Sequence, residues 1–158
     1  MPFAVPLYQF FYKRLRPKGV VELKVGGLRL RINAADPGIA PWLLVGKEFS
    51  PAEVRFLERT LKSGMVFVDV GANIGYFSLI AAKLVGPAGS VYAFEPDQEN
   101  FSLLVQNIQI NNLGNITAVN KAVADKTGQA KLYLDAQNSC RHSLAPKDSQ
   151  HFQEIETI

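Results

Sequence analysis

One stretch of the sequence decides the fold: Val66-Phe67-Val68-Asp69-Val70-Gly71-Ala72-Asn73-Ile74-Gly75-Tyr76-Phe77. Its β-branched and aromatic residues over 66–70 predict a buried strand, and a helical pattern begins after the second of its two glycines. Because glycine has no Cβ, a strand–turn–helix of this kind brings backbone close to a small ligand. The helix that follows directs its free N–H groups toward the turn. The stretch therefore predicts a binding turn in an α/β protein.

A second predicted strand, Ser90-Val91-Tyr92-Ala93-Phe94, ends in Glu95-Pro96. One predicted helix lies between the two strands, so we expect them to be parallel neighbours. Asp69 and Glu95 then lie at the same edge of the sheet, where open α/β sheets bind their ligands. Pro96 also biases Glu95 toward an extended backbone.

The glycine spacing indicates which ligand this edge binds. A dinucleotide site requires the pattern G-x-G-x-x-G, but Asn73 stands where the second glycine is needed, and its side chain would crowd a pyrophosphate. Asp69 would repel phosphate and suits a cation. The ligand that fits is a nucleoside with a ribose diol and a positively charged amino-acid tail, as in S-adenosylmethionine. We expect Glu95 to accept both ribose hydroxyls and Asp69 to help hold the ammonium end.

The two motifs together resemble those of the FkbM-type methyltransferases, a class I group that depends on S-adenosylmethionine. The resemblance spans residues 48–144 and is carried by Asp69–Tyr76, Tyr92–Pro96 and Ala122–Gly128. It implies a Rossmann-like sheet and O-methylation of a hydroxyl on a sugar or other natural product. The implied partner is a small-molecule or glycan acceptor, with no nucleic acid. The cofactor-binding residues that we expect are Asp69, Gly71, Ala72, Asn73, Gly75, Glu95 and, on the adenine side, Ala122.

Each of these residues also has a structural interpretation. Gly71 and Gly75 could serve only close packing of helix on strand, and Asn73 could bond only the backbone of its own loop. Glu95 could be a solvated charge at a strand end. Two alternative functions stay open as well: a non-catalytic Rossmann-like binding module and a nicotinamide-dependent oxidoreductase. The missing G-x-G-x-x-G pattern argues against the oxidoreductase.

The sheet is expected to be incomplete. After residue 65 the sequence offers four strand candidates, Val66–Val70, Val91–Phe94, Ile116–Val119 and Ala130–Leu134. The resemblance implies seven strands and a later Ile-Asp-Val-Glu-Gly-like motif, which the sequence does not contain. We therefore expect a truncated class I methyltransferase sheet that lacks its C-terminal strands, with Glu154–Ile158 as the opening of another strand.

An N-terminal extension, residues 1–49, precedes the expected cofactor-binding domain, residues 50–158. Its first part, residues 1–19, is aromatic and basic, which is compatible with weak contact to a membrane surface or with a short helix packed on the domain. Alternating apolar residues around Gly26-Gly27 then predict a β-hairpin. We interpret Trp42, in the following Pro/Gly loop, as a packing anchor, and Ser50 as the side-chain cap of a helix that Pro51 begins.

Composition limits the remaining possibilities. The chain has 158 residues, 47% of them apolar, and a formal net charge of +3, which suits a globular domain. Cys140 is the single cysteine, so an internal disulfide is excluded, and no Cys/His cluster has the spacing of a metal site. No apolar run approaches the length of a membrane span, and we expect a cytoplasmic location.

The group that performs catalysis is the hardest to find in the sequence. Methyl transfer from a sulfonium depends mainly on alignment of the reacting atoms, and a hydroxyl acceptor often needs a general base. His142 is the weak candidate for that base, in a polar segment that follows the strand near Leu134. A solvated loop histidine is the structural alternative.

Overall fold

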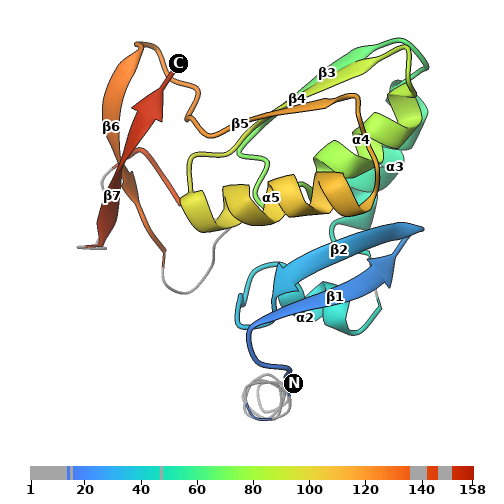
Figure 1. The fold of residues 1–158 in the computed structure, drawn as a ribbon, viewed down its shortest axis with the longest axis horizontal. Coiled ribbons are helices and arrows are strands. Elements are labelled where there is room, and N and C mark those ends of the chain that lie inside the picture. Colours follow the sequence, from blue (N-terminus) through green and yellow to red (C-terminus); the bar gives the residue numbers. More distant parts are fainter. Residues whose placement is uncertain (1–13, 15, 47, 136–141, 146–150) are drawn as a thin grey trace.

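The computed structural model describes residues 14, 16–46, 48–135, 142–145 and 151–158. At its centre is a parallel sheet with the strand order β3-β4-β5, made of β3 (Val66–Val70), β4 (Ser90–Phe94) and β5 (Ile116–Val119). Helices α4 (Tyr76–Val85) and α5 (Gln98–Ile110) connect the strands and lie on the same side of the sheet (Figure 1). This arrangement is the predicted α/β class with Rossmann-like crossovers.

Along each strand, the side chains alternate between the face of the sheet that the helices cover and the open face. On β4, Val91 and Ala93 are fully buried beneath the helices, whereas Tyr92 between them is 42% exposed. The alternating valines of β3, Val66 and Val68, are also exposed, on the face that no described helix covers. The carboxyl ends of all three strands still meet at one edge, because the pairing is parallel and in sequence order.

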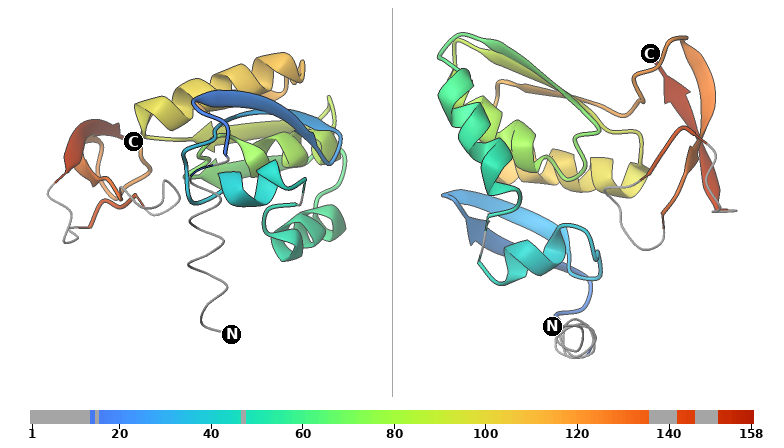
Figure 2. Two further views of the ribbon diagram at one scale, coloured as in Figure 1. Left: turned by 90° about the horizontal axis from the view of Figure 1, so that it is seen from below. Right: turned by 180° about the vertical axis from the view of Figure 1, so that it is seen from behind.

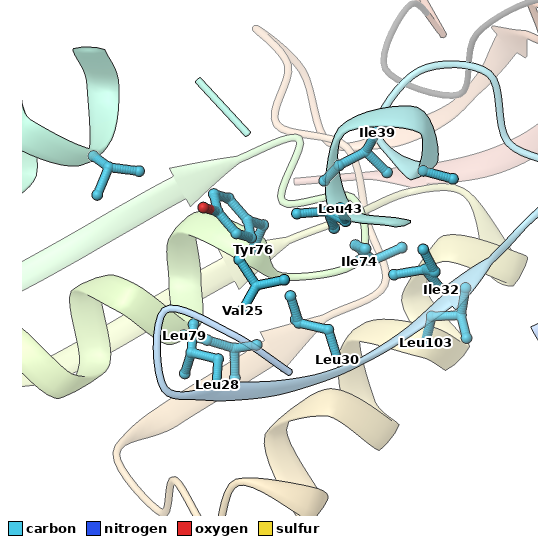
Figure 3. Packing of buried hydrophobic residues seen from close by; sticks show 12 residues of the cluster. Val25, Leu28, Leu30, Ile32, Ile39, Leu43, Ile74, Tyr76, Leu79 and Leu103 are labelled. Carbon is cyan, nitrogen blue, oxygen red and sulfur yellow. The ribbon is translucent and has the colours of Figure 1, made fainter. Parts of the chain in front are cut away.

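The predicted hairpin is formed by β1 (Val20–Val25) and β2 (Leu28–Asn33), which pair antiparallel up to Val25 and Leu28. Gly26 and Gly27 both have positive φ, +55° and +73°, as the two central residues of a type I′ hairpin turn require. The hairpin packs on the helices from the side away from the sheet (Figure 2). Its buried side chains join Ile74, Tyr76 and Leu79 in a single apolar cluster (Figure 3).

Two details of the loop that follows differ from expectation. Residues 40–44 form a short helix, α2 (Ala40–Leu44), which turns Ala40 and Leu43 into the core and leaves Trp42 53% exposed, so Trp42 is not a packing anchor. Helix α3 (Pro51–Thr60) begins at Pro51 as predicted. Ser50 has left-handed backbone angles and its side chain makes no capping hydrogen bond, so the predicted cap is wrong.

The last two strands, β6 (Gly128–Tyr133) and β7 (Phe152–Thr157), form an antiparallel pair beside the N-terminal end of α5 (Figures 1 and 2). A parallel bridge between Ala122 and Thr157 connects this pair to the segment after β5. The expected strand over 154–158 is thus present, as the partner of β6. The apolar cluster described above crosses residue 49, and the division into parts 1–49 and 50–158 stays a prediction.

Across the described residues, no helix is both long and apolar enough to cross a membrane. The proposed membrane contact through residues 1–19 falls largely on residues 1–13, which lie outside the described part of the chain.

Candidate functional site

The backbone N–H groups of the turn between β3 and α4 already donate hydrogen bonds within the protein. Gly71 and Ala72 both donate to the carbonyl oxygen of Phe94 at 2.9 Å, and Gly75 donates to the carbonyl of Ala72 at 2.8 Å. The N–H of Ile74 donates to Oδ1 of Asn73 at 2.9 Å. A pyrophosphate needs free N–H donors at this position, and the turn offers few of them.

Glu95 occupies the neighbouring strand end and is only 5% exposed. Its carboxylate accepts hydrogen bonds from the backbone N–H of Asn73 at 2.7 Å and from that of Asp97 at 2.9 Å. Burial raises the pKa of Glu95 to about 7, although both donors favour the charged form. Glu95 is therefore not a solvated strand-end charge.

A cavity of about 210 Å³ lies over this sheet edge. It brings together five of the predicted site residues, which come from the turn, the end of β4 and the segment after β6: Gly71, Ala72, Asn73, Glu95 and His142. The rest of its wall is mainly apolar and aromatic: Ile39, Phe49, Ile74, Tyr76, Phe77, Pro96 and Leu132. One buried carboxylate in a mainly apolar and aromatic wall suits a small organic ligand with a few hydroxyl groups.

The two glycines of the turn differ in what surrounds them. Gly71 has φ +78°, and a Cβ added there would meet nothing within 4 Å, so its backbone is open to the cavity. Gly75 has φ +88°, and an added Cβ would lie 2.5 Å from Cδ1 of Leu104. Gly75 thus permits close packing of the turn on α5, whereas Gly71 leaves space for a ligand.

Asp69 and Ala122 do not line the cavity. The carboxylate of Asp69 accepts a hydrogen bond of 2.6 Å from the Ser78 hydroxyl, and burial raises its pKa. Asp69 thereby fixes the first turn of α4. Ala122 donates its N–H to the carbonyl of Glu156 at 2.9 Å and accepts from the N–H of Ile158 at 3.0 Å, so β7 already uses its backbone.

His142 lines the cavity, but its ring is placed to donate a hydrogen bond and not to accept a proton. Nδ1 of His142 accepts from the backbone N–H of Asp135 at 3.0 Å. In a neutral imidazole whose Nδ1 accepts, the proton is on Nε2. The ring as it lies can donate a hydrogen bond from Nε2 and cannot remove a proton there, so this geometry does not suit a general base.

Sequence reasoning missed several residues of the site. Phe49, Tyr76 and Phe77 form a group of aromatic rings whose centroids lie 5.4–6.2 Å apart, and Phe49 comes from the N-terminal part of the chain. The role of Asn120 was missed as well: its Nδ2 donates to the carbonyl of Glu95 at 2.8 Å and so holds this strand end. Its position directly after a predicted strand was the one signal that could have identified it.

No group of His, Cys, Asp and Glu residues in the described part of the chain is placed to hold a metal ion.

Comparison with known proteins identifies the family of this domain. A family model described as the TRM5/TYW2 methyltransferase domain matches residues 47–142, more than half of the chain. The ribosomal protein L11 methyltransferase of Bacillus cereus (strain Q1) is 34% identical over 92 residues, which are 56% of this chain and 28% of that protein. The chain thus spans little more than a quarter of this curated relative.

Solved structures agree on the fold. P. horikoshii TYW2, solved in complex with MeSAdo, shares 26% identity over 67% of this chain and 37% of that one, with a TM-score of 0.50. The M. jannaschii tRNA m1G37 methyltransferase shares 21% identity over 70% and 36%, with a TM-score of 0.51. These likenesses confirm the Rossmann-like class I methyltransferase fold.

Two expectations change as a result. The family that matches is the TRM5/TYW2 domain, so the class I methyltransferase assignment is confirmed and the FkbM-type assignment is not. The expected partner, a small-molecule or glycan acceptor with no nucleic acid, was wrong, because the relatives are named for tRNA and for a ribosomal protein.

Proposed function

The chain belongs to the family of TRM5/TYW2 methyltransferase domains, and we propose that it binds S-adenosylmethionine for methyl transfer to an RNA or protein acceptor. The observation that carries the proposal is the buried carboxylate of Glu95 beside the open backbone of Gly71 in one aromatic cavity. The MeSAdo complex of P. horikoshii TYW2 and the acceptors for which the relatives are named support it.

The residues present fit the nucleoside part of this cofactor. A charged Glu95 can accept two ribose hydroxyls while its backbone donors remain in place, because each carboxylate oxygen has more than one lone-pair site. Gly71 lets the ligand approach the backbone, and Tyr76 and Phe77 supply aromatic wall. The cavity of about 210 Å³ is smaller than a site for a whole drug-sized ligand, about 300–1,000 Å³. We assign it to the nucleoside.

A buried donor, the Asn100 side chain, also lies close to this carboxylate. Asn100 is 7% exposed, and its Nδ2 completes no hydrogen bond in the described structure. The Asn100 amide is near enough to Glu95 to favour the charged form and so to lower the pKa of that carboxyl. Asn100 does not line the nucleoside cavity, so its amide acts on the Glu95 carboxylate.

When bound, S-adenosylmethionine supplies an activated methyl group on a sulfonium. The task we propose for this chain's residues is to hold the nucleoside in a fixed orientation, since alignment accounts for much of the acceleration in such displacements. Asp69 contributes by fixing the first turn of α4 through Ser78. Ala122 contributes by packing against Leu132, which lines the cavity.

The specific acceptor, the FkbM-type family and the oxidoreductase alternative considered from the sequence are not supported. No comparison supports O-methylation of a sugar or natural product, or membership of the FkbM-type family. A nicotinamide-dependent oxidoreductase is disfavoured by the geometry, because the turn's N–H groups are used internally.

Amide chemical shifts of the isotope-labelled chain, recorded with added S-adenosylhomocysteine, test the proposal. We expect the largest changes at Gly71, Ala72 and Asn73, and about tenfold to a hundredfold weaker binding in Glu95→Gln, since hydrogen bonds to charged groups contribute about 1.5–3 kcal/mol. Glu58→Gln, an exposed change on α3, is the matched control. Shift changes confined to another face, or equal affinity in both variants, would refute the proposal.

A further inference from the structure

His142 carries a hydrogen-bond donor that no contact described so far uses. The residue lines the nucleoside cavity of about 210 Å³ on the same wall as Glu95, Pro96 and Leu132. It also lines a larger cavity of about 820 Å³ that reaches the N-terminal end of α5. A group at this position can contact a ligand that Glu95 holds from another element of the fold.

The backbone beside His142 is fixed on β6. The N–H of Tyr133 donates to the carbonyl of Ser143 at 2.8 Å, and the N–H of Ser143 donates to the carbonyl of Tyr133 at 3.1 Å. Strand β6 is in turn paired with β7 over all six of its residues. The position of His142 is therefore set by strand pairing on its C-terminal side.

The imidazole ring of His142 is fixed as well. Its Nδ1 accepts a hydrogen bond of 3.0 Å from the backbone N–H of Asp135, so the proton of the neutral ring is on Nε2. Among the residues that the structure describes, Nε2 has no hydrogen-bond partner. A donor whose orientation is set before a ligand binds loses little freedom when the ligand arrives.

A nucleoside offers acceptors that match such a donor. The charged Glu95 carboxylate can only accept hydrogen bonds, so it satisfies the ribose hydroxyl protons and no acceptor atom of the ligand. The backbone N–H groups of Gly71, Ala72 and Asn73 already donate within the protein. The ring nitrogens of the base and the lone pairs of the ribose oxygens therefore need a donor from a side chain.

We propose that Nε2–H of His142 donates a hydrogen bond to an acceptor atom of the nucleoside, either a ring nitrogen of the base or a ribose oxygen. The inference rests on the proposed function above. It gives His142 the role of a second anchor for the cofactor, in place of the general base expected from the sequence. A ligand held at Glu95 alone can pivot about that carboxylate, whereas a contact from β6 fixes its orientation for methyl transfer.

Two substitutions separate this role from a purely structural one. Asparagine places Oδ1 as many bonds from Cβ as Nδ1 of histidine, so His142→Asn keeps an acceptor for the Asp135 N–H and loses the donor. Glutamine places its amide nitrogen as many bonds from Cβ as Nε2 of histidine, so His142→Gln keeps a donor and loses that acceptor. His151→Asn is the matched control, because His151 is exposed and does not line the nucleoside cavity.

Calorimetric titration with S-adenosylhomocysteine at pH 8, where Glu95 is mostly charged, compares the variants. We expect His142→Asn to bind about threefold to tenfold more weakly than the parent chain, as loss of one neutral hydrogen bond predicts, with an unchanged thermal midpoint. His142→Gln should lose less affinity and have the lower midpoint, because the Asp135 N–H loses its acceptor. His151→Asn should match the parent chain.

Adenosine analogues in which one ring nitrogen at a time is replaced by C–H identify the acceptor atom. If that atom is a base nitrogen, one analogue binds the parent chain several-fold more weakly than adenosine does, and His142→Asn binds the two equally. If it is a ribose oxygen, His142→Asn weakens the binding of adenosine and of every analogue by the same factor.

Two results would overturn the inference: equal affinity of His142→Asn and the parent chain for S-adenosylhomocysteine, or a larger loss in His142→Gln than in His142→Asn. Failure of the folded parent chain to bind S-adenosylhomocysteine would instead refute the proposed function. NMR of the parent chain with isotope-labelled histidine tests the same contact without a substitution. The Nε2–H signal of His142 should shift and exchange more slowly with water at saturating S-adenosylhomocysteine, and an unchanged signal would also overturn the inference.

Discussion

At the scale of single residues, Glu95 links ligand binding to pH. Its pKa is about 7 in the folded chain against an ordinary value of 4.5, because it is buried. The folded chain therefore holds this proton more tightly than the unfolded chain does. The resulting contribution to stability is complete below about pH 4.5 and is lost as the pH rises through about 7. Binding of a ribose diol has the opposite dependence, since it requires the charged carboxylate.

We expect the affinity for S-adenosylhomocysteine to rise about tenfold between pH 6 and pH 8, because a group with a pKa near 7 is about nine-tenths protonated at pH 6. Calorimetric titrations at several pH values measure this change. Glu95→Gln should bind more weakly and lose most of the dependence. An unchanged slope in that variant would assign the pH dependence to another group.

A substitution at Gly75 tests how closely the turn packs on α5. Gly75→Ala places a Cβ 2.5 Å from Cδ1 of Leu104, which is fully buried, at a φ of +88° that alanine rarely adopts. We expect a loss of about 1–3 kcal/mol in the free energy of unfolding, measured by urea denaturation. Gly114→Ala is the control, because a Cβ there meets nothing within 4 Å. Similar effects of the two substitutions would show that Leu104 does not restrict the turn.

At the scale of elements, Asn107 of α5 and Asn111, the C-cap residue of that helix, hold the hairpin. Asn107 is fully buried; its Oδ1 accepts from the N–H of Arg31 at 2.6 Å, and its Nδ2 donates to the carbonyls of Arg31 and Ile74. Asn111, one turn later, makes the equivalent pair of hydrogen bonds with the backbone of Arg29. These side chains satisfy the backbone groups of β2 in place of a third strand.

Asn107→Ala should cost about 2–4 kcal/mol of stability, because it leaves several buried backbone groups without partners. Asn111→Ala, in a more exposed position, should cost about 1 kcal/mol. Chemical denaturation of both variants gives the comparison. Equal losses would mean that burial at position 107 adds nothing to this contact.

Elements with strong local signals were predicted from the sequence. The parallel strands and the Gly26-Gly27 hairpin depend on residues close in the chain, and the structure contains both. The role of Asn107 was not predicted, since a single polar residue in an apolar helical stripe carries no signal of its partner 76 positions away. Trp42 was misinterpreted because the short helix α2 gives no periodic pattern.

At the scale of the whole molecule, the hairpin and the helices of the sheet share one apolar core. Trp42 is the single tryptophan and lies in α2, in the N-terminal part of the chain. We expect urea unfolding followed by its fluorescence to coincide with unfolding followed by far-ultraviolet circular dichroism. Two separated transitions would show that residues 1–49 unfold independently.

Only part of the candidate site could be predicted from the sequence, because some of its residues come from segments far apart in the chain. Gly71, Asn73 and Glu95 belong to local motifs at parallel strand ends, so the sequence placed them at one edge. Phe49 and Asn120 reach the same site through packing between distant segments. These local motifs carry no signal of the acceptor, and the expectation of a small-molecule or glycan acceptor was wrong.

The central claim is that this sheet edge binds S-adenosylmethionine through its nucleoside. The measurement that tests it most directly is calorimetric titration of the 158-residue chain with S-adenosylhomocysteine at pH 8, where Glu95 is mostly charged, with NADH as the comparison ligand. We expect one molecule of S-adenosylhomocysteine to bind per chain and NADH not to bind. Binding of NADH alone, or of neither compound by a chain that circular dichroism shows to be folded, would contradict the claim.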